Sequence, residues 1–244
     1  MANESGTWIM YGVSEDDPEC IHTVEEAMEL INEIGFLPLF KNDIPGFSLE
    51  ERTVPDYWWS GNKLRDPWEW REIIAASGQV AYGKFFDKKA GFISKQWFPV
   101  FANCRRDGYD FDSLWDDELA SRRQKKIMDL FEEPEAELFS FEVKEKAGFG
   151  KGGEKNFEGT ITGLQMMTYL VVRDFRQKKS KKGKAYGMPV AVYCRPEKLW
   201  GYEYVTSCYR EDPKVSAERI RSYMEERYPI ADEKQVTKLI GVKK

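Results

Sequence analysis

The sequence contains a single histidine, His22, among 244 residues. A zinc site built from several histidines and an HExxH metalloprotease site are therefore both excluded. A Ser-His-Asp triad would depend on His22, which precedes a helix signal and has no nucleophile motif around it. We expect His22 to be a solvated residue beside a helix cap, and we expect neither a bound metal nor a cofactor.

Cysteine is also scarce. Cys20, Cys104, Cys194 and Cys208 are widely spaced, and no CxxC pair occurs. In a chain without a secretion signal, such cysteines are most simply reduced thiols in packing positions.

Long apolar runs are absent. No stretch of about 18 apolar residues occurs, as a membrane-spanning helix would need. The N-terminal MANESGTWIM lacks the basic and apolar regions of a secretory signal. Since hydrophobic residues make up 41% of the chain, we expect a folded cytoplasmic protein that does not span a membrane.

The net charge of −5 hides an asymmetry along the chain. Residues 140–200 contain 13 Lys and Arg against 6 Asp and Glu, which gives +7 and leaves −12 on the remainder. A basic module on an acidic body is typical of local contact with nucleic acid.

The N-terminal part begins with residues 1–22, which are polar, acidic and weakly periodic, so we interpret them as a loose segment. A helix is predicted to follow. Thr23 and Glu26 form a capping box at its start, and Gly35 ends it.

A second helix and a hairpin complete the region 23–115, which we interpret as degenerate and winged-helix-like. Asp66 can cap the helix, with Pro67 at its first position. The runs AYGKFF and GFISKQWF predict a β-hairpin with Gly91 in its turn.

Residues 116–200 follow the element order of a winged-helix module, which needs three helices and a hairpin. An amphipathic pattern predicts one continuous helix over residues 116–132. Ser140 is placed to cap a second helix over residues 140–149, in which Phe141 packs inward.

The third helix, over about residues 155–167, is the expected recognition helix. Phe157, Ile161 and Leu164 recur on one face and are expected to be buried. The opposite face would look into a major groove through Lys155, Glu158, Thr162 and Gln165.

A basic hairpin, the wing, is predicted to follow this helix. The strand-like runs TYLVVRDF and MPVAVYC flank RQKKSKKGKAYG. Like charges at this density favour a phosphate partner, although a solvated hairpin tip that keeps the edge soluble is the alternative. The expected contacts are Arg173, Arg176, Lys178, Lys179, Lys181, Lys182 and Lys184.

The region 201–244 predicts two C-terminal helices, over residues 216–228 and 232–240. The whole pattern predicts an α+β fold that is mainly helical, with several winged-helix units and β-hairpins. Duplex DNA is the expected partner.

Several motifs resemble the AlkZ-related proteins of the wider AlkZ/YcaQ DNA glycosylase superfamily. They are DPWEWR, YGKFFDKKAGFIS, WFPVFANCRRDGYDFD, ASRRQKKIMDLFEE and the stretch from GFGKGGEKNF to RPEKLWG, and together they cover about residues 23–210. The resemblance implies several winged-helix units and a small β-rich element around a DNA channel. It also implies repair of alkylated or crosslinked DNA by base excision.

The chain departs from that family at the catalytic motif. In the glycosylases a Gln-x-Gln or Gln-x-Asp motif follows the first helix, whereas Leu37, Pro38 and Leu39 stand here. These side chains carry no hydrogen-bond donor or acceptor and cannot position water or offset charge at C1′. The chemistry is therefore either lost or moved to other residues.

Glu69, Asp110 and Asp112 are the candidate catalytic residues, since an acid in an aromatic setting has a raised pKa and can act as a base. The alternative is that Arg105 and Arg106 form ion pairs with the two aspartates across a turn.

A tryptophan-rich segment offers candidates for stacking on an everted base, namely Trp58, Trp59 and Trp70, with Tyr57 and Trp68 beside them. The alternative interpretation is that these rings fill the core.

Three functions stay open at this point. The first is a DNA-binding protein of the glycosylase-related type without the usual catalytic motif. The second is an active DNA glycosylase with displaced catalytic residues. The third is a winged-helix module that docks a protein partner.

Overall fold

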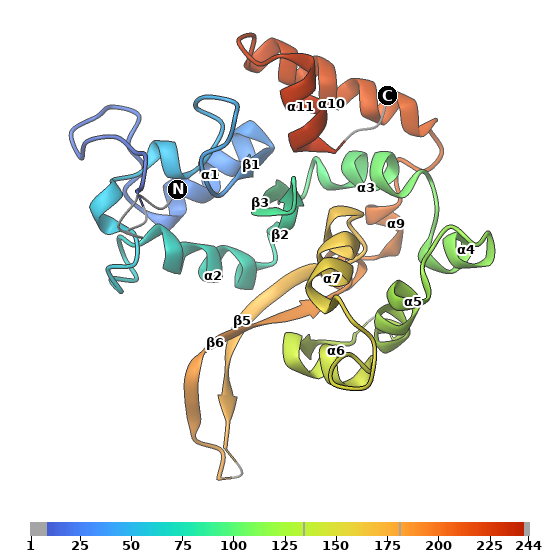
Figure 1. The fold of residues 1–244 in the computed structure, drawn as a ribbon. Coiled ribbons are helices and arrows are strands. Elements are labelled where there is room, and N and C mark those ends of the chain that lie inside the picture. The colour runs from blue at the N-terminus through green and yellow to red at the C-terminus, as the bar shows by residue number, and fades with distance from the viewer. Residues whose placement is uncertain (1–8, 134, 181, 242–244) are drawn as a thin grey trace.

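A computed structural model describes residues 9–133, 135–180 and 182–241, and it shows an α+β fold (Figure 1). One six-stranded sheet runs through the molecule in the order β1-β3-β2-β5-β6-β4. Each pair of neighbouring strands is antiparallel. The two halves of the sheet meet at a single residue pair, Tyr82 and Val172.

The first predicted helix is confirmed as α1 (Val24–Ile34), but its capping box forms only in part, because the Glu26 carboxylate accepts the His22 N–H at 2.7 Å. The Glu26 N–H donates to Thr23 Oγ1 at 3.2 Å, and Gly35 ends the helix with a φ of +88°. Strand β1 (Phe36–Pro38) follows directly.

Two short 3-10 helices, η1 (Glu50–Arg52) and η2 (Pro55–Tyr57), lead to α2 (Pro67–Ser77). The Trp68 N–H donates to the Asp66 carboxylate at 2.9 Å, so the predicted cap of α2 is confirmed. Residues 1–8 of the expected loose segment lie outside the described residues, and residues 9–22 hydrogen-bond to the η1 region through Val13 and Ile21.

The predicted hairpin is confirmed as β2 (Val80–Phe86) and β3 (Lys89–Ser94), but its predicted turn is wrong. The turn consists of Asp87 and Lys88, both with positive φ. Gly91 lies within β3, where a Cβ atom would stand 2.5 Å from the Phe86 ring. This glycine therefore allows a close approach and does not make a turn.

The next segment forms α3 (Phe98–Arg106), α4 (Phe111–Asp116), α5 (Arg122–Met128) and η3 (Asp129–Phe131). The single helix predicted over residues 116–132 is therefore wrong. Glu118 adopts a φ of +59°, and Ser121 starts a new helix through a capping box with Gln124. Leu119, in the break between the two helices, is 61% exposed.

The following elements are β4 (Leu138–Phe139), α6 (Ser140–Lys146), α7 (Phe157–Met166), β5 (Val171–Lys179) and β6 (Ala185–Cys194). Ser140 is the first residue of α6 and not its cap, and Phe141 is exposed where we expected it to pack inward. The third predicted helix is confirmed as α7, with Phe157, Ile161 and Leu164 buried.

The chain ends with α8 (Pro196–Trp200), α9 (Tyr202–Val205), α10 (Pro213–Arg227) and α11 (Glu233–Ile240). The two long C-terminal helices confirm the prediction, and α10 packs against α3 (Figure 1). Tyr223 of α10 donates from its hydroxyl to the Ile34 carbonyl at 2.7 Å, which ties the end of the chain to α1.

One hydrophobic core cluster includes residues from α1 through α11. Its largest fully buried side chains include Trp70, Phe36, Phe101 and Phe131. Among the described residues, none of the helices combines the length and the apolar character that crossing a membrane requires.

Candidate nucleic-acid interface

The β5–β6 hairpin projects from the body of the molecule (Figure 1). Its base is fixed to α2, because the Arg173 guanidinium donates to the Ala76 carbonyl at 2.8 Å. The buried Arg71 guanidinium lies 3.7 Å from the centre of the Trp68 ring and 4.2 Å from that of Phe175 on β5. These contacts give the hairpin a rigid attachment.

Glu137 lies within ion-pair distance of three cationic side chains at the base of the hairpin. Its carboxylate lies 2.5 Å from Arg176 and within 3.6 Å of Arg173 and Lys198. Burial alone would raise the pKa of Glu137, but the Arg176 hydrogen bond and the nearby positive charges hold it below its ordinary value. Arg173 and Arg176, both predicted to contact phosphate, are therefore already paired with a carboxylate.

The end of the hairpin differs from its base in its charge balance. Lys179, Lys182 and Lys184 are exposed, and no carboxylate in the described part of the chain lies within ion-pair distance of them. Lys178 is half-buried, with its ammonium 4.4 Å from the centre of the Phe141 ring. Lys181, also predicted to contact phosphate, lies outside the described residues.

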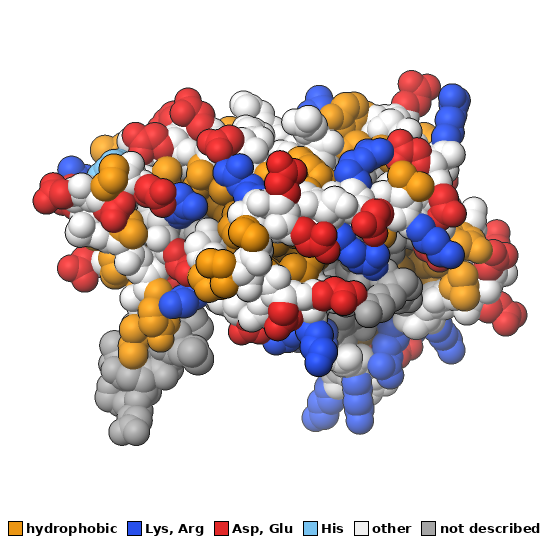
Figure 2. All heavy atoms as spheres, turned by 90° about the horizontal axis from the view of Figure 1, so that it is seen from above, with side chains coloured by type: hydrophobic (Ala, Val, Ile, Leu, Met, Phe, Trp, Pro, Cys, Tyr) orange, Lys and Arg blue, Asp and Glu red, His pale blue; other side chains and the backbone are white. Residues whose placement is uncertain are grey.

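More unpaired lysines lie on α6 and in the segment between α6 and α7. Lys144, Lys146, Lys151 and Lys155 are exposed, and none forms an ion pair with a described residue. Figure 2 shows Lys and Arg side chains gathered along one edge of the molecule, and carboxylates around the histidine at the other end. Lysines without a described carboxylate partner are therefore numerous in this part of the molecule, and others, such as Lys63 and Lys214, lie elsewhere on the surface.

The prediction that one face of α7 is open to a DNA groove is wrong for two of its residues. Thr162 and Gln165 are buried. Gln165 accepts the Lys84 N–H of β2 at 3.0 Å and donates to the Ile161 carbonyl at 3.3 Å. The side of α7 that we expected to face a groove therefore packs against the sheet, while Lys155 and Glu158 are exposed.

Two of the three tryptophans proposed for base stacking are buried, and one is exposed. Trp58 and Trp70 are buried, and their indole N–H groups donate to Thr53 Oγ1 and to the Leu64 carbonyl. They fill the core and cannot stack on a base without unfolding. Trp59 is 45% exposed, so it keeps an accessible face.

The prediction that Arg105 and Arg106 form ion pairs with Asp110 and Asp112 is wrong. Arg106 pairs with Glu197 at 2.8 Å, and Arg105 donates to the carbonyls of Phe85 and Ile240. Neither guanidinium forms an ion pair with Asp110 or Asp112.

Asp110 and Asp112 instead line a cavity of about 200 Å³ with Arg195 and Tyr202. The Tyr202 hydroxyl donates to Asp110 Oδ2 at 2.6 Å, and this hydrogen bond raises the pKa of Tyr202 to about 12. Asp110 Oδ1 is buried and accepts no hydrogen bond from the described residues. Glu69, the third candidate acid, is half-buried on α2 and does not line this cavity.

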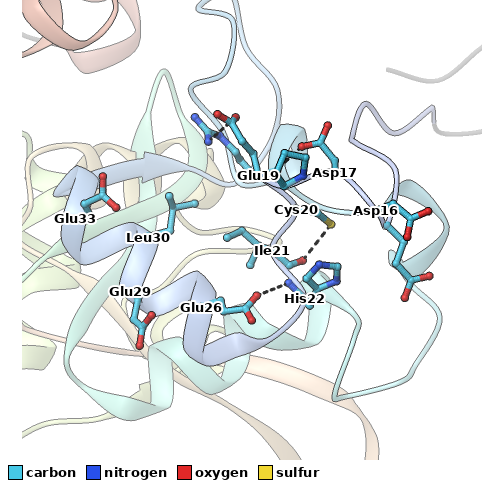
Figure 3. A pocket seen from close by; sticks show the side chains of 13 residues that line it. Asp16, Asp17, Glu19, Cys20, Ile21, His22, Glu26, Glu29, Leu30 and Glu33 are labelled. Atoms are coloured by element: carbon cyan, nitrogen blue, oxygen red, sulfur yellow. Dashed lines mark hydrogen bonds and ion pairs between the residues drawn. The ribbon is translucent and has the colours of Figure 1, made fainter.

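The largest concentration of acids surrounds His22 in a hollow of about 590 Å³ (Figure 3). Glu26 accepts the His22 backbone N–H at 2.7 Å, and Glu19 pairs with Arg52 at 3.0 Å. A surface this rich in carboxylates repels phosphate, so it is unsuited to contact with nucleic acid. No group of three or more His, Cys, Asp or Glu among the described residues is placed to hold a metal ion.

The comparisons with known proteins bear on the chain as a whole. Residues 21–241 match the model of the family described as AlkZ related. The chain belongs to the AlkZ-related family. No curated protein and no solved structure is detectably similar to it.

In this AlkZ-related chain, the stretch where the resemblance places a catalytic Gln motif forms β1. Phe36, Leu37 and Leu39 are fully buried, and β1 pairs with β3. Apolar side chains that pack in the core therefore occupy the positions of the polar motif. Strand β1 itself contains no polar side chain.

The sequence analysis did not predict the irregularity in strand β6 of the hairpin. Met188 is 81% exposed at an irregularity of β6, next to Gly187 and Pro189. A glycine and a proline one residue apart within a strand are a signal for a bulge. That signal was present in the sequence motif YGMP.

Proposed function

We propose that this AlkZ-related protein binds duplex DNA through the β5–β6 hairpin and the α6–α7 segment. The observation that carries the proposal is the set of exposed hairpin lysines, Lys179, Lys182 and Lys184, without carboxylate partners among the described residues. Phosphate groups neutralise such charges, and the release of condensed counterions makes binding favourable.

The element order supports a winged-helix interpretation of this part of the chain. The order is α5-β4-α6-α7-β5-β6, and β4 pairs with β6. Three helices with a small antiparallel sheet and a long hairpin are what a winged-helix module over residues 116–200 requires. In this proposal, residues 23–115 and 201–244 form the regions that carry the module.

The test is the salt dependence of duplex binding, measured by fluorescence anisotropy. The variant Lys179→Ala/Lys182→Ala/Lys184→Ala should bind more weakly on every sequence, and its slope of log K against log salt should fall by up to about 2.7, since each phosphate contact adds about 0.9. The matched control is Lys63→Ala/Lys214→Ala/Lys234→Ala, which removes the same charge from exposed positions outside the hairpin.

Equal losses in the two variants would mean that only net charge matters and would overturn the assignment to the hairpin. No binding of duplex, single strand or RNA by the unaltered protein at about 50 mM salt, where phosphate contacts dominate, would favour a protein partner instead.

A second candidate function is hydrolysis of an N-glycosidic bond at the cavity that contains Asp110. The observation in its favour is the buried Asp110 Oδ1, which accepts no hydrogen bond from the described residues. Asp110 lines the cavity, and a carboxylate there can take a proton from water as the water attacks C1′ and the bond to the base breaks. With this activity, the role of the protein would be repair of alkylated or crosslinked DNA.

Incubation with alkylated duplex and an assay for abasic sites decide between the two candidates. Product that disappears in Asp110→Asn but persists in Asp112→Asn would support catalysis at Asp110. No product above background at stoichiometric protein would leave DNA binding alone.

A further inference from the structure

A two-residue bulge in β6 changes the direction of the hairpin. Arg176 pairs with Val190 and Lys178 pairs with Tyr186, so one residue of β5 faces three residues of β6. Gly187 supplies a φ of +75°, and its carbonyl accepts a hydrogen bond from the Gln177 side chain at 2.8 Å. Such bulges re-aim side chains and bend the strand that contains them.

The side chain that this bulge displays is apolar. Met188 is 81% exposed, and Tyr186 beside it is 53% exposed. Exposure of two large side chains brings no folding stability, because hydrophobic stabilisation comes from removing apolar surface from water. A partner that bound this part of the hairpin would remove their apolar surface from water.

The surroundings of Met188 indicate the chemistry of that molecule. Lys179 and Lys184 lie at the same end of the hairpin, without carboxylate partners among the described residues. Charge complementarity favours a polyanion, and an apolar side chain on the same hairpin as the lysines favours a polyanion with an apolar interior. Duplex DNA has both properties, since stacked bases lie between its phosphate strands.

We propose that Met188 is a wedge that inserts between adjacent base pairs of DNA. This inference rests on the proposed function, because the lysines must first hold the hairpin against the phosphates. Minor-groove proteins use Met and Pro wedges to unstack one base step and kink the duplex. The anchored hairpin base, with Arg173 bound to the Ala76 carbonyl, holds the wedge against the resistance of the stack.

The experiment measures binding and unstacking on the same DNA. Short duplexes with 2-aminopurine at successive positions report loss of stacking as a rise in fluorescence, while anisotropy reports binding. The unaltered protein should raise the fluorescence at saturation. Met188→Ala should lose this rise and keep the salt slope, because it leaves the phosphate contacts intact. Met188→Leu should restore the rise.

Ile230→Ala is the matched control, since Ile230 is 85% exposed in the turn between α10 and α11 and is equally apolar. It should leave both signals unchanged. Duplex binding without any fluorescence rise, or an equal rise with Met188→Ala, would overturn the wedge and leave the proposed function intact. Either result would assign the exposed side chains to a protein partner. Absence of duplex binding would overturn both.

Discussion

Arg106 donates from Nη1 to Glu197 Oε1 at 2.8 Å, and both side chains are buried. The pair joins α3 to α8. A second guanidinium nitrogen of Arg106 donates to the Thr168 carbonyl at 2.7 Å. Burial alone would raise the pKa of Glu197, but the charge of Arg106 holds it below its ordinary value. The two charges therefore compensate each other inside the core.

Removing one member of this pair should strongly destabilise the fold. Arg106→Met leaves Glu197 buried, with Arg195, 3.4 Å away, as its remaining ion-pair partner among the described residues. Breaking a buried pair costs about 3–5 kcal/mol, and Arg195 places the expected loss near the lower end. Urea unfolding measures the difference.

The matched control is Arg227→Met, which removes the exposed partner of Glu33 at 2.9 Å. Exposed pairs contribute about 0–1 kcal/mol. Equal losses in the two variants would contradict a special role for the buried pair.

Gln165 is expected to act on stability and not on DNA specificity. Gln165→Leu leaves the Lys84 N–H without its acceptor, and an unsatisfied buried donor costs about 1–3 kcal/mol. Duplex binding by the folded fraction should be unchanged on every sequence. A relaxed sequence preference in Gln165→Leu, at unchanged stability, would restore the recognition-face interpretation.

The sequence predicted elements whose signals are local. The caps of α1 and α2 follow from Thr23 and Asp66, because a cap depends only on a side chain and the N–H groups two or three residues away. The basic hairpin was likewise visible in its strand-like flanks and its lysines. Local chemistry was sufficient in each of these cases.

Predictions that depend on distant partners were wrong. The outward face expected for α7 fails because Gln165 bonds to β2, 81 residues away in sequence. The ion pairs expected for Arg106 fail because Glu197, 91 residues away, is its partner. Periodicity reports which residues share a face, but not which element covers that face.

Acid should weaken the hairpin base through Glu137. A carboxyl group whose pKa is lowered on folding contributes stability above its ordinary value of 4.5, and loses that contribution as the pH falls through the lowered value. Glu137→Gln should therefore lower stability at neutral pH and flatten the fall in stability below pH 4.5. Hydrogen exchange of the β5 and β6 amides against pH measures both effects.

The comparison is Glu225→Gln on α10, an exposed position that removes the same charge without contacting the hairpin. Hairpin exchange profiles that are identical in the two variants would show that Glu137 does not control the hairpin base.

Two glycines should respond in opposite directions to the same substitution. Gly91→Ala places a Cβ atom 2.5 Å from the Phe86 ring and 2.8 Å from the Leu37 carbonyl oxygen. The backbone atom cannot yield without breaking the pairing of β1 with β3, so we expect a loss of about 1–3 kcal/mol or more.

Gly163 lies within α7, and a Cβ atom there meets nothing within 4 Å. Since Gly in a helix interior is less favourable than Ala by about 0.5–1 kcal/mol, Gly163→Ala should stabilise the protein by about that amount. Thermal and urea unfolding of both variants supply the measurement. A stabilising Gly91→Ala would mean that β1 and β3 lie farther apart than the structure has them, and a destabilising Gly163→Ala would mean that the outer face of α7 is covered.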